Sequence, residues 1–144
     1  MTLPLARTLP PCLAALALLL GGCATYDTDV ARGRSLAGIK KYFVVSNLND
    51  NHALDHHLAA SLRARGFEAE VGPLTMMPDD TQAVVTYQDH WAWDFGDHLT
   101  FFRLHVREPH LRQPFATITF TARVPLREKP TVTVDRLIGR LLEQ

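Results

Sequence analysis

The segment "AVVTYQDHWAWDFGDHLTFFRLHVRE", residues 83–108, decides the fold because it contains two strand-like runs joined by a short turn. Apolar and polar residues alternate along 83–94 and 98–108, and the "FG" between them favours a two-residue hairpin turn at Phe95 and Gly96. Such a turn pairs Val85, Tyr87, Asp89, Trp91 and Trp93 with Val106, Leu104, Phe102, Thr100 and His98. We therefore predict a hairpin with one apolar and one polar face. Phenylalanine is unfavourable at the first turn position, so a longer loop or a bulge is the alternative.

The segments around this hairpin predict the rest of the domain. Residues 115–124 alternate as a third antiparallel strand, and residues 39–48 and 67–72 have strand-like composition. Residues 52–65 and 131–144 carry apolar side chains at helical spacing. A sheet with one apolar face needs helices to cover that face. We predict an α+β fold, a two-layer sandwich in which a mainly antiparallel sheet has two helices packed on one face.

The hairpin contains one residue that conflicts with its surroundings. In the expected register, Asp89 lies on the apolar face beside Tyr87 and Trp91. A buried carboxylate is costly without a hydrogen-bond partner, so we expect Asp89 to have one or to sit at a bulge. The two tryptophans fit cross-strand packing in the core, and Asp94 and Asp97 fit turn-capping roles.

The chain begins with a pattern that is typical of a secretory signal. Arg7 precedes an apolar run from Cys12 to Leu20, and Gly21 and Gly22 follow. The run is about half the length needed to cross a bilayer. We expect it to be cleaved.

The residues Leu20-Gly21-Gly22-Cys23 resemble the lipobox of bacterial lipoproteins. The resemblance implies cleavage before Cys23 and a diacylglycerol and an N-acyl chain on that cysteine. By the sorting rule of this family, Ala24 at the next position implies the periplasmic face of the outer membrane. Residues 1–22 would then be a signal peptide, residues 23–38 a lipidated tether and residues 39–144 a single domain.

The composition limits the classes of function. Cleavage leaves 122 of the 144 residues, which suits one domain. Cys12 leaves with the signal and Cys23 carries lipid, so we expect no disulfide. The 15 basic and 15 acidic residues balance, which gives no electrostatic support for nucleic-acid binding.

Histidines suggest one candidate site. His52 and His56 are four residues apart in the predicted helix, where they would share a face and could hold zinc or copper with Asp55 or a distant histidine. The glutamate of a metalloprotease signature is missing. The alternative is a solvated helix face without a cofactor.

The polar face of the sheet is the second candidate site. It carries His90, Arg103, His105, Arg107 and Arg123. Arginine pairs well with carboxylates and phosphates, so this face is a candidate docking surface for an envelope protein or an anionic envelope component.

Nothing in the sequence indicates catalysis. The serines after the signal, Ser35, Ser46 and Ser61, lack a nucleophile-elbow context, and no phosphate-binding or dinucleotide motif is present. We expect a non-enzymatic outer-membrane lipoprotein whose periplasmic domain binds an envelope partner. The alternatives are a periplasmic metal-binding lipoprotein and an immunity lipoprotein that neutralises a toxin.

Overall fold

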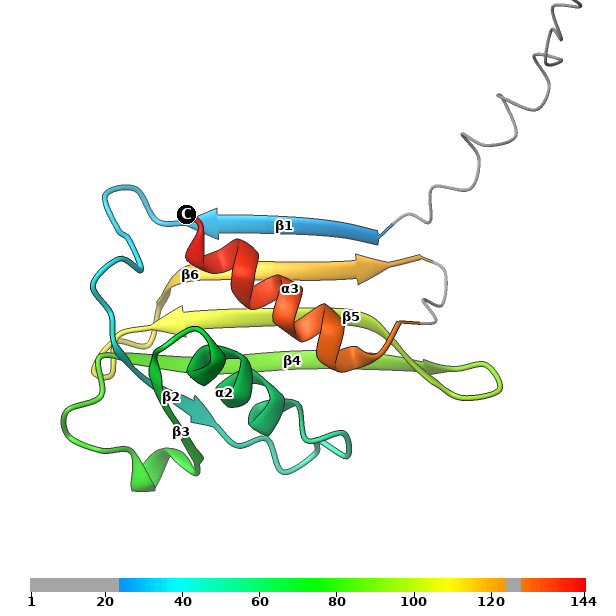
Figure 1. Ribbon diagram of the computed structural model, residues 1–144, viewed down its shortest axis with the longest axis horizontal. Coiled ribbons are helices and arrows are strands. Elements are labelled where there is room, and N and C mark those ends of the chain that lie inside the picture. Colours follow the sequence, from blue (N-terminus) through cyan, green and yellow to red (C-terminus); the bar gives the residue numbers. More distant parts are fainter. Residues whose placement is uncertain (1–23, 124–127) are drawn as a thin grey trace, which may run out of the picture.

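A six-stranded mixed sheet carries the domain (Figure 1). The computed structural model describes residues 24–123 and 128–144. Its strands are β1 (Ala24–Val30), β2 (Lys41–Val45), β3 (Glu68–Gly72), β4 (Ala83–Trp93), β5 (Asp97–Arg107) and β6 (Pro114–Ala122), and its helices are α2 (Leu54–Ala64), α3 (Pro130–Leu142) and the short 3₁₀ turn η1 (Leu74–Met76). The strand order is β1-β6-β5-β4-β2-β3. The predicted α+β class and the mostly antiparallel sheet are confirmed. The predicted signal peptide and Cys23 lie outside the described residues.

Strand β2 is parallel to both of its neighbours, β3 and β4. The connection from β2 to β3 runs through α2, because parallel strands need a crossover long enough to return the chain to the same end. The sequence predicted both strands and the helix but not their relative direction.

The expected tether over residues 23–38 is wrong for residues 24–30, which form the edge strand β1. This strand pairs antiparallel with β6 along its whole length. Its alternate residues are half-buried, and the ring of Tyr26 lies 5.2 Å from that of Phe120. Small and polar residues between the apolar ones hid this alternation in the sequence.

The hairpin of β4 and β5 follows the expected register only near its base. Val85, Tyr87 and Asp89 pair with Val106, Leu104 and Phe102 as expected. The expected partners of Trp91 and Trp93 are wrong, because the register shifts between His90 and Trp91 and the strands are joined by three residues, 94–96. The alternative of a bulge and a longer loop is therefore the one observed.

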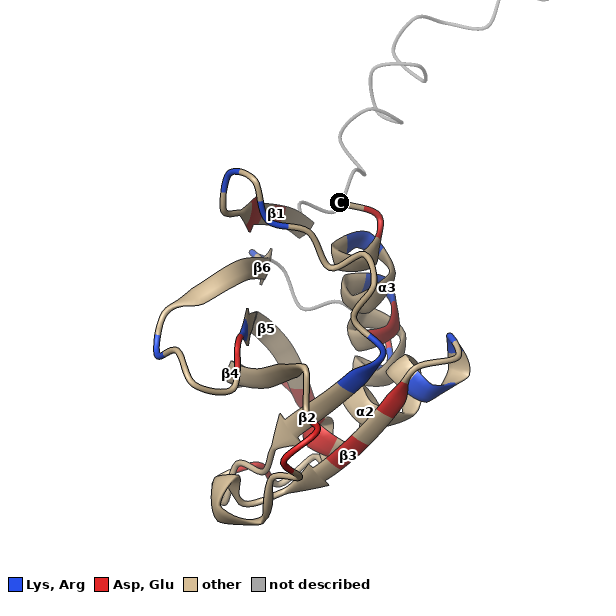
Figure 2. Ribbon diagram, turned by 90° about the vertical axis from the view of Figure 1, so that its left-hand side faces the viewer, with Lys and Arg blue, Asp and Glu red and all other residues tan. Residues whose placement is uncertain are grey.

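Both helices lie on the same side of the curved sheet (Figure 2). Their apolar side chains form one core with the inward residues of the strands. Fully buried members include Phe102 on β5, Phe120 on β6, Leu58 on α2 and Leu137 on α3. The apolar stripe predicted for the last helix is confirmed, since Val134, Leu137, Ile138 and Leu141 are all buried.

We expect Phe102→Ala to lower the free energy of unfolding by about 3–5 kcal/mol, because it leaves a cavity in the centre of the core. Urea denaturation followed by circular dichroism measures this change. Phe95→Ala is the matched control, since Phe95 is 97% exposed and its loss removes no buried contact. Equal destabilisation by the two variants would contradict the position of the core.

Candidate functional site at the aromatic hairpin tip

Two large aromatic side chains are exposed at the end of the β4–β5 hairpin. Trp93 is 75% exposed and Phe95 is 97% exposed, and their ring centroids lie 6.2 Å apart. We call this pair the aromatic tip. Phe95 has a positive φ of 53°, a conformation that non-glycine residues rarely adopt. Phe95 therefore adopts a costly backbone conformation without contributing to the core.

The aromatic tip projects beyond the rest of the sheet at the end where the described chain begins. Four paired residues form a row across the sheet: Thr25 of β1, Thr121 of β6, Phe101 of β5 and His90 of β4. We use the position of this row along the strands as a reference level. Strand β4 continues three residues past this level to Trp93, or roughly 10 Å at the rise of an extended strand. Ala24 lies one residue past the level in the same direction, so the described chain begins at the tip end. Figure 1 shows the hairpin extending past β1 and β6 on this side.

A bulge separates the aromatic tip from the regular part of the hairpin. The register shift after His90 sets Trp91 opposite Leu99. The indole of Trp91 packs partly against the core, and its Nε1–H donates a hydrogen bond of 2.6 Å to Asp89. The expected partner of Asp89 is thus a neighbouring tryptophan on its own strand.

Asp50 ties the segment before α2 to β4. Its carboxylate accepts hydrogen bonds from the backbone N–H of His52 at 2.7 Å and of Leu54 at 2.5 Å, and from the hydroxyl of Tyr87 at 2.6 Å. Burial alone would raise the pKa of Asp50, but these hydrogen bonds outweigh burial and lower the pKa below its ordinary value. Burial and the bond to Asp50 raise the pKa of Tyr87, which therefore remains a donor.

The two histidines of the predicted metal site do not share a helix face. The helix begins at Leu54, so His52 lies before it and stacks on Trp91. His56 lies on α2, where its side chain is largely exposed. Among residues 24–123 and 128–144, no group of three or more histidine, cysteine, aspartate or glutamate side chains is arranged to hold a metal ion.

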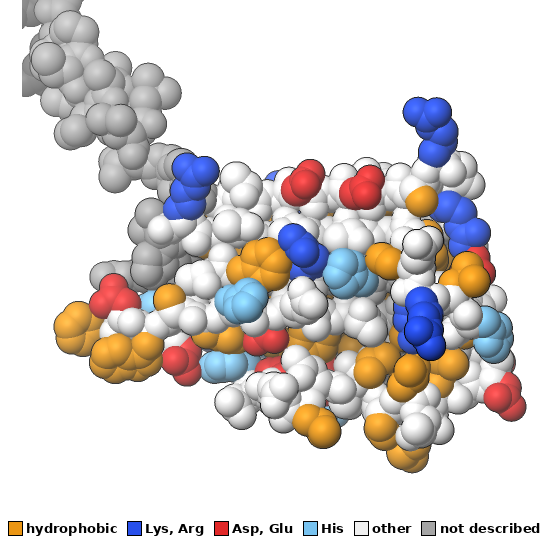
Figure 3. All heavy atoms as spheres, turned by 180° about the vertical axis from the view of Figure 1, so that it is seen from behind, with side chains coloured by type: hydrophobic (Ala, Val, Ile, Leu, Met, Phe, Trp, Pro, Cys, Tyr) orange, Lys and Arg blue, Asp and Glu red, His pale blue; other side chains and the backbone are white. Residues whose placement is uncertain are grey.

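The basic residues predicted on the polar face divide into separate groups. His90 and Arg103 flank Phe101, at 5.2 Å between ring centroids for His90 and 5.1 Å from the guanidinium carbon to the ring centroid for Arg103. His105 bonds to Thr117 at 3.0 Å. Burial and the charge of Arg103 lower the pKa of His105, so it is neutral at pH 7. Figure 3 shows histidine and basic side chains in the middle of this face.

The two remaining arginines lie at opposite ends of β6. Arg107 is opposite Pro114, and its guanidinium donates hydrogen bonds of 3.0–3.1 Å to the backbone oxygens of Glu108, Pro109 and Leu111. It therefore holds the loop after β5. Arg123 is exposed just after the other end of β6. The structure brings together three of the five predicted binding residues, His90, Arg103 and His105.

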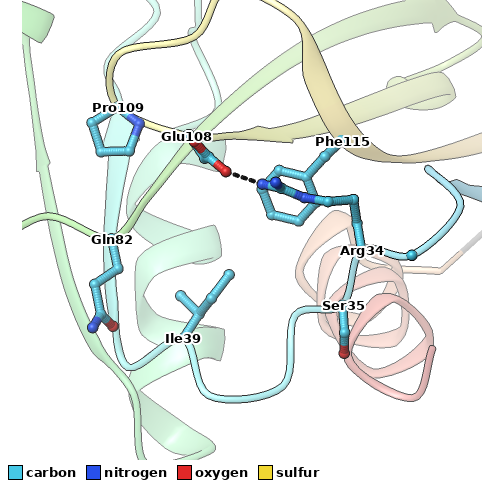
Figure 4. Close-up of a pocket in the computed structure, with 8 residues that line it drawn as sticks. Arg34, Ser35, Ile39, Gln82, Glu108, Pro109 and Phe115 are labelled. Atoms are coloured by element: carbon cyan, nitrogen blue, oxygen red, sulfur yellow. Dashed lines mark hydrogen bonds and ion pairs between the residues drawn. The ribbon is translucent and has the colours of Figure 1, made fainter.

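Hollows in the surface of the described residues include two of similar volume. One, of about 480 Å³, lies at the end opposite the aromatic tip, where Arg34 pairs with Glu108 and its guanidinium carbon is 4.8 Å from the ring centroid of Phe115 (Figure 4). The other, of about 510 Å³, lies beside β4 and is lined by Asn47, Asn49, Tyr87, Gln88, Asp89, His90 and Trp91. The first hollow was not indicated by the sequence.

Sequence reasoning missed the aromatic tip because it assigned both tryptophans to the core. The signal that could have revealed it was Phe95, whose position in the turn is unfavourable for folding alone. Within the described ranges, no helix is long and apolar enough to cross a membrane.

The chain matches no protein-family model, and no curated protein is significantly similar to it in sequence. Two solved structures of PelC from Paraburkholderia phytofirmans share its fold. A PelC dodecamer in space group P6 gives a TM-score of 0.62 at 18% identity, and a dodecamer of a point variant in space group C2 gives 0.59 at 17%. Each match covers 83% of this chain and 95% of the PelC chain. At such identities the likeness establishes the fold alone.

We expect Asp50→Ala to lower the free energy of unfolding at pH 7 by about 1–2 kcal/mol, since α2 loses its capping carboxylate. Because the pKa of Asp50 is lowered by folding, its contribution is present above the ordinary aspartate pKa of about 4 and is lost as the pH falls below that value. Urea denaturation at several pH values should show the two proteins converging in acid. A difference that is constant with pH would contradict this role of the carboxylate.

Proposed function

We propose that this chain is a non-enzymatic lipoprotein, anchored through Cys23 at the periplasmic face of the outer membrane, whose domain binds an envelope partner. The observation that carries the proposal is the position of the aromatic tip, which projects at the end where Cys23 joins the domain. A lipid on Cys23 would hold this end of the domain close to the bilayer. The tip would then add a second, weaker contact to the anchor.

The chemistry of the aromatic tip suits a membrane surface. Aromatic side chains are enriched where membranes meet water, and an indole can keep its N–H in the polar layer while its ring lies deeper. Exposed aromatic rings that fill no pocket of their own fold are otherwise a liability for solubility. Figure 3 shows exposed hydrophobic side chains at this end of the molecule, and others at the opposite end.

With the aromatic tip at the membrane, the polar face of the sheet is the surface that would bind the partner. In a two-layer sandwich with both described helices on one side, no other element of the described chain covers the opposite face of β4, β5 and β6. His90 and Arg103 lie on either side of the Phe101 ring there, so this row of side chains offers an aromatic ring and a guanidinium to an acidic surface.

We include further copies of this chain among its partners. Both PelC structures are described as dodecamers, and their fold is the one found here. Copies anchored in one bilayer must all present the same end to it, so they would be related by a rotation axis normal to the membrane. Such a ring requires two different surfaces of each copy to meet.

We expect the aromatic tip to contact lipid when the lipidated protein is reconstituted in vesicles. Brominated acyl chains should quench part of the tryptophan fluorescence, and Trp93→Ser with Phe95→Ser should remove that part because the exposed indole is lost. Met76→Ser is the control, since Met76 is 72% exposed but lies on η1, before the opposite end of β4. Equal quenching of wild type and the tip variant would contradict the proposed orientation.

We expect the lipidated protein, purified from detergent-solubilised envelopes, to carry a second, differently tagged copy of itself and a stoichiometric envelope protein. Mass spectrometry identifies both. In the Cys23→Ser control the protein should leave the membrane fraction and the envelope protein should be lost, because the anchor no longer concentrates the chain at the membrane. An empty purification from wild-type envelopes would contradict the binding role.

A further inference from the structure

The outer part of the hairpin, residues 91–99, needs a support because it extends past the neighbouring strand β6. Thr121 of β6 pairs with Phe101, which lies below this segment. Leu99 is buried, but the side chains from Ala92 to His98 are exposed or only partly covered. An aromatic stack and an ion pair link this segment to the rest of the described chain. His52 makes both contacts.

The contact of His52 with the hairpin is a close ring stack. Its imidazole lies 3.6 Å from the ring of Trp91 between centroids, with an angle of 21° between the planes. Nε2 of His52 is also 3.8 Å from a carboxylate oxygen of Asp97 on β5. His52 therefore touches both strands of the hairpin just below the aromatic tip.

His52 is itself held in place from behind. Its backbone N–H donates to Asp50, whose carboxylate also binds Tyr87 on β4. The next residue, Ala53, has a positive φ of 54°, a conformation that is costly for alanine. This strained residue lies at the turn between His52 and α2. The imidazole of His52 faces the hairpin from this turn.

We propose that His52 is a positioning residue whose stack on Trp91 fixes the direction of the aromatic tip. This inference rests on the proposed function, in which the direction of the tip decides whether Trp93 and Phe95 meet the lipid surface. Trp91 lies on the same side of β4 as Tyr87 and Asp89, and the register shift beside it leaves Thr100 of β5 without a partner on β4. The stack on His52 therefore lies at the point where the regular pairing of the hairpin is interrupted. Without the stack, the outer hairpin would pivot at the bulge.

The stack carries this role rather than the ion pair. The Asp97 carboxylate is 55% exposed and 3.8 Å from the imidazole, and such pairs contribute little in water. A close aromatic pair contributes more than its buried area alone. The two contributions can be separated, because phenylalanine preserves the stack without the ring nitrogens and Asp97→Asn removes the charge alone.

The test uses the lipidated full-length chain in vesicles with brominated acyl chains, with hydrogen exchange of the amides of residues 92–98 as a second readout. We expect His52→Ala to speed this exchange about fivefold, the effect of losing a contact of about 1 kcal/mol, and to reduce the lipid quenching of Trp93. His52→Phe and Asp97→Asn should behave as wild type. His56→Ala is the matched control, since His56 lies four residues further on and is largely exposed.

Wild-type exchange in His52→Ala would overturn the inference, as would loss of protection in His52→Phe equal to that in His52→Ala. Exchange that responds to His52→Ala, while wild-type Trp93 is not quenched by the vesicles, would support the stack and overturn the proposed contact with lipid. Circular dichroism of each variant confirms that it is folded.

Discussion

The alternation of buried and partly exposed side chains along β5 and β6 is the constraint on which the rest of the domain depends. From Phe102 to Val106 and from Phe115 to Ala122, the buried residues nearly all fall on one face. A shift of one residue in either strand would turn phenylalanines into water and arginine or threonines into the core. The apolar face must be covered, and α2 and α3 supply the apolar stripes that cover it. The opposite face is left polar for the same reason.

Toward the tip of the hairpin, the side chains no longer alternate between buried and exposed, and interactions other than core packing determine the structure there. The bulge at Trp91 and the positive φ angles of Ala53 and Phe95 each cost free energy that core packing does not repay locally. Asp50 offsets part of that cost with hydrogen bonds to His52 before α2, to Leu54 in α2 and to Tyr87 in β4. The result is a hydrogen-bonded base that carries two exposed aromatic side chains, which add nothing to the core.

The likeness to PelC concerns the fold that core packing determines, and not the contacts at the tip of the hairpin. A fold that depends on a period of two in the strands and an apolar stripe on each helix tolerates many sequences, so 17–18% identity is enough to preserve it. The stack of His52 on Trp91 and the bonds of Arg107 to the loop after β5 are side-chain contacts, which a likeness of fold does not address. Function must be argued from such sites and not from the fold.

The sequence by itself determined the α+β class, the helices, the lower register of the hairpin and the need of Asp89 for a partner, because these depend on residues close in the chain. Tertiary structure decided the pairing of β1, the direction of β2 relative to its neighbours and the position of the bulge. It also decided that His52 stacks on a tryptophan rather than joining His56, and that Arg107 binds backbone oxygens of the loop after β5. These outcomes depend on which strands become neighbours and on where α2 begins, and local periodicity carries no information about either.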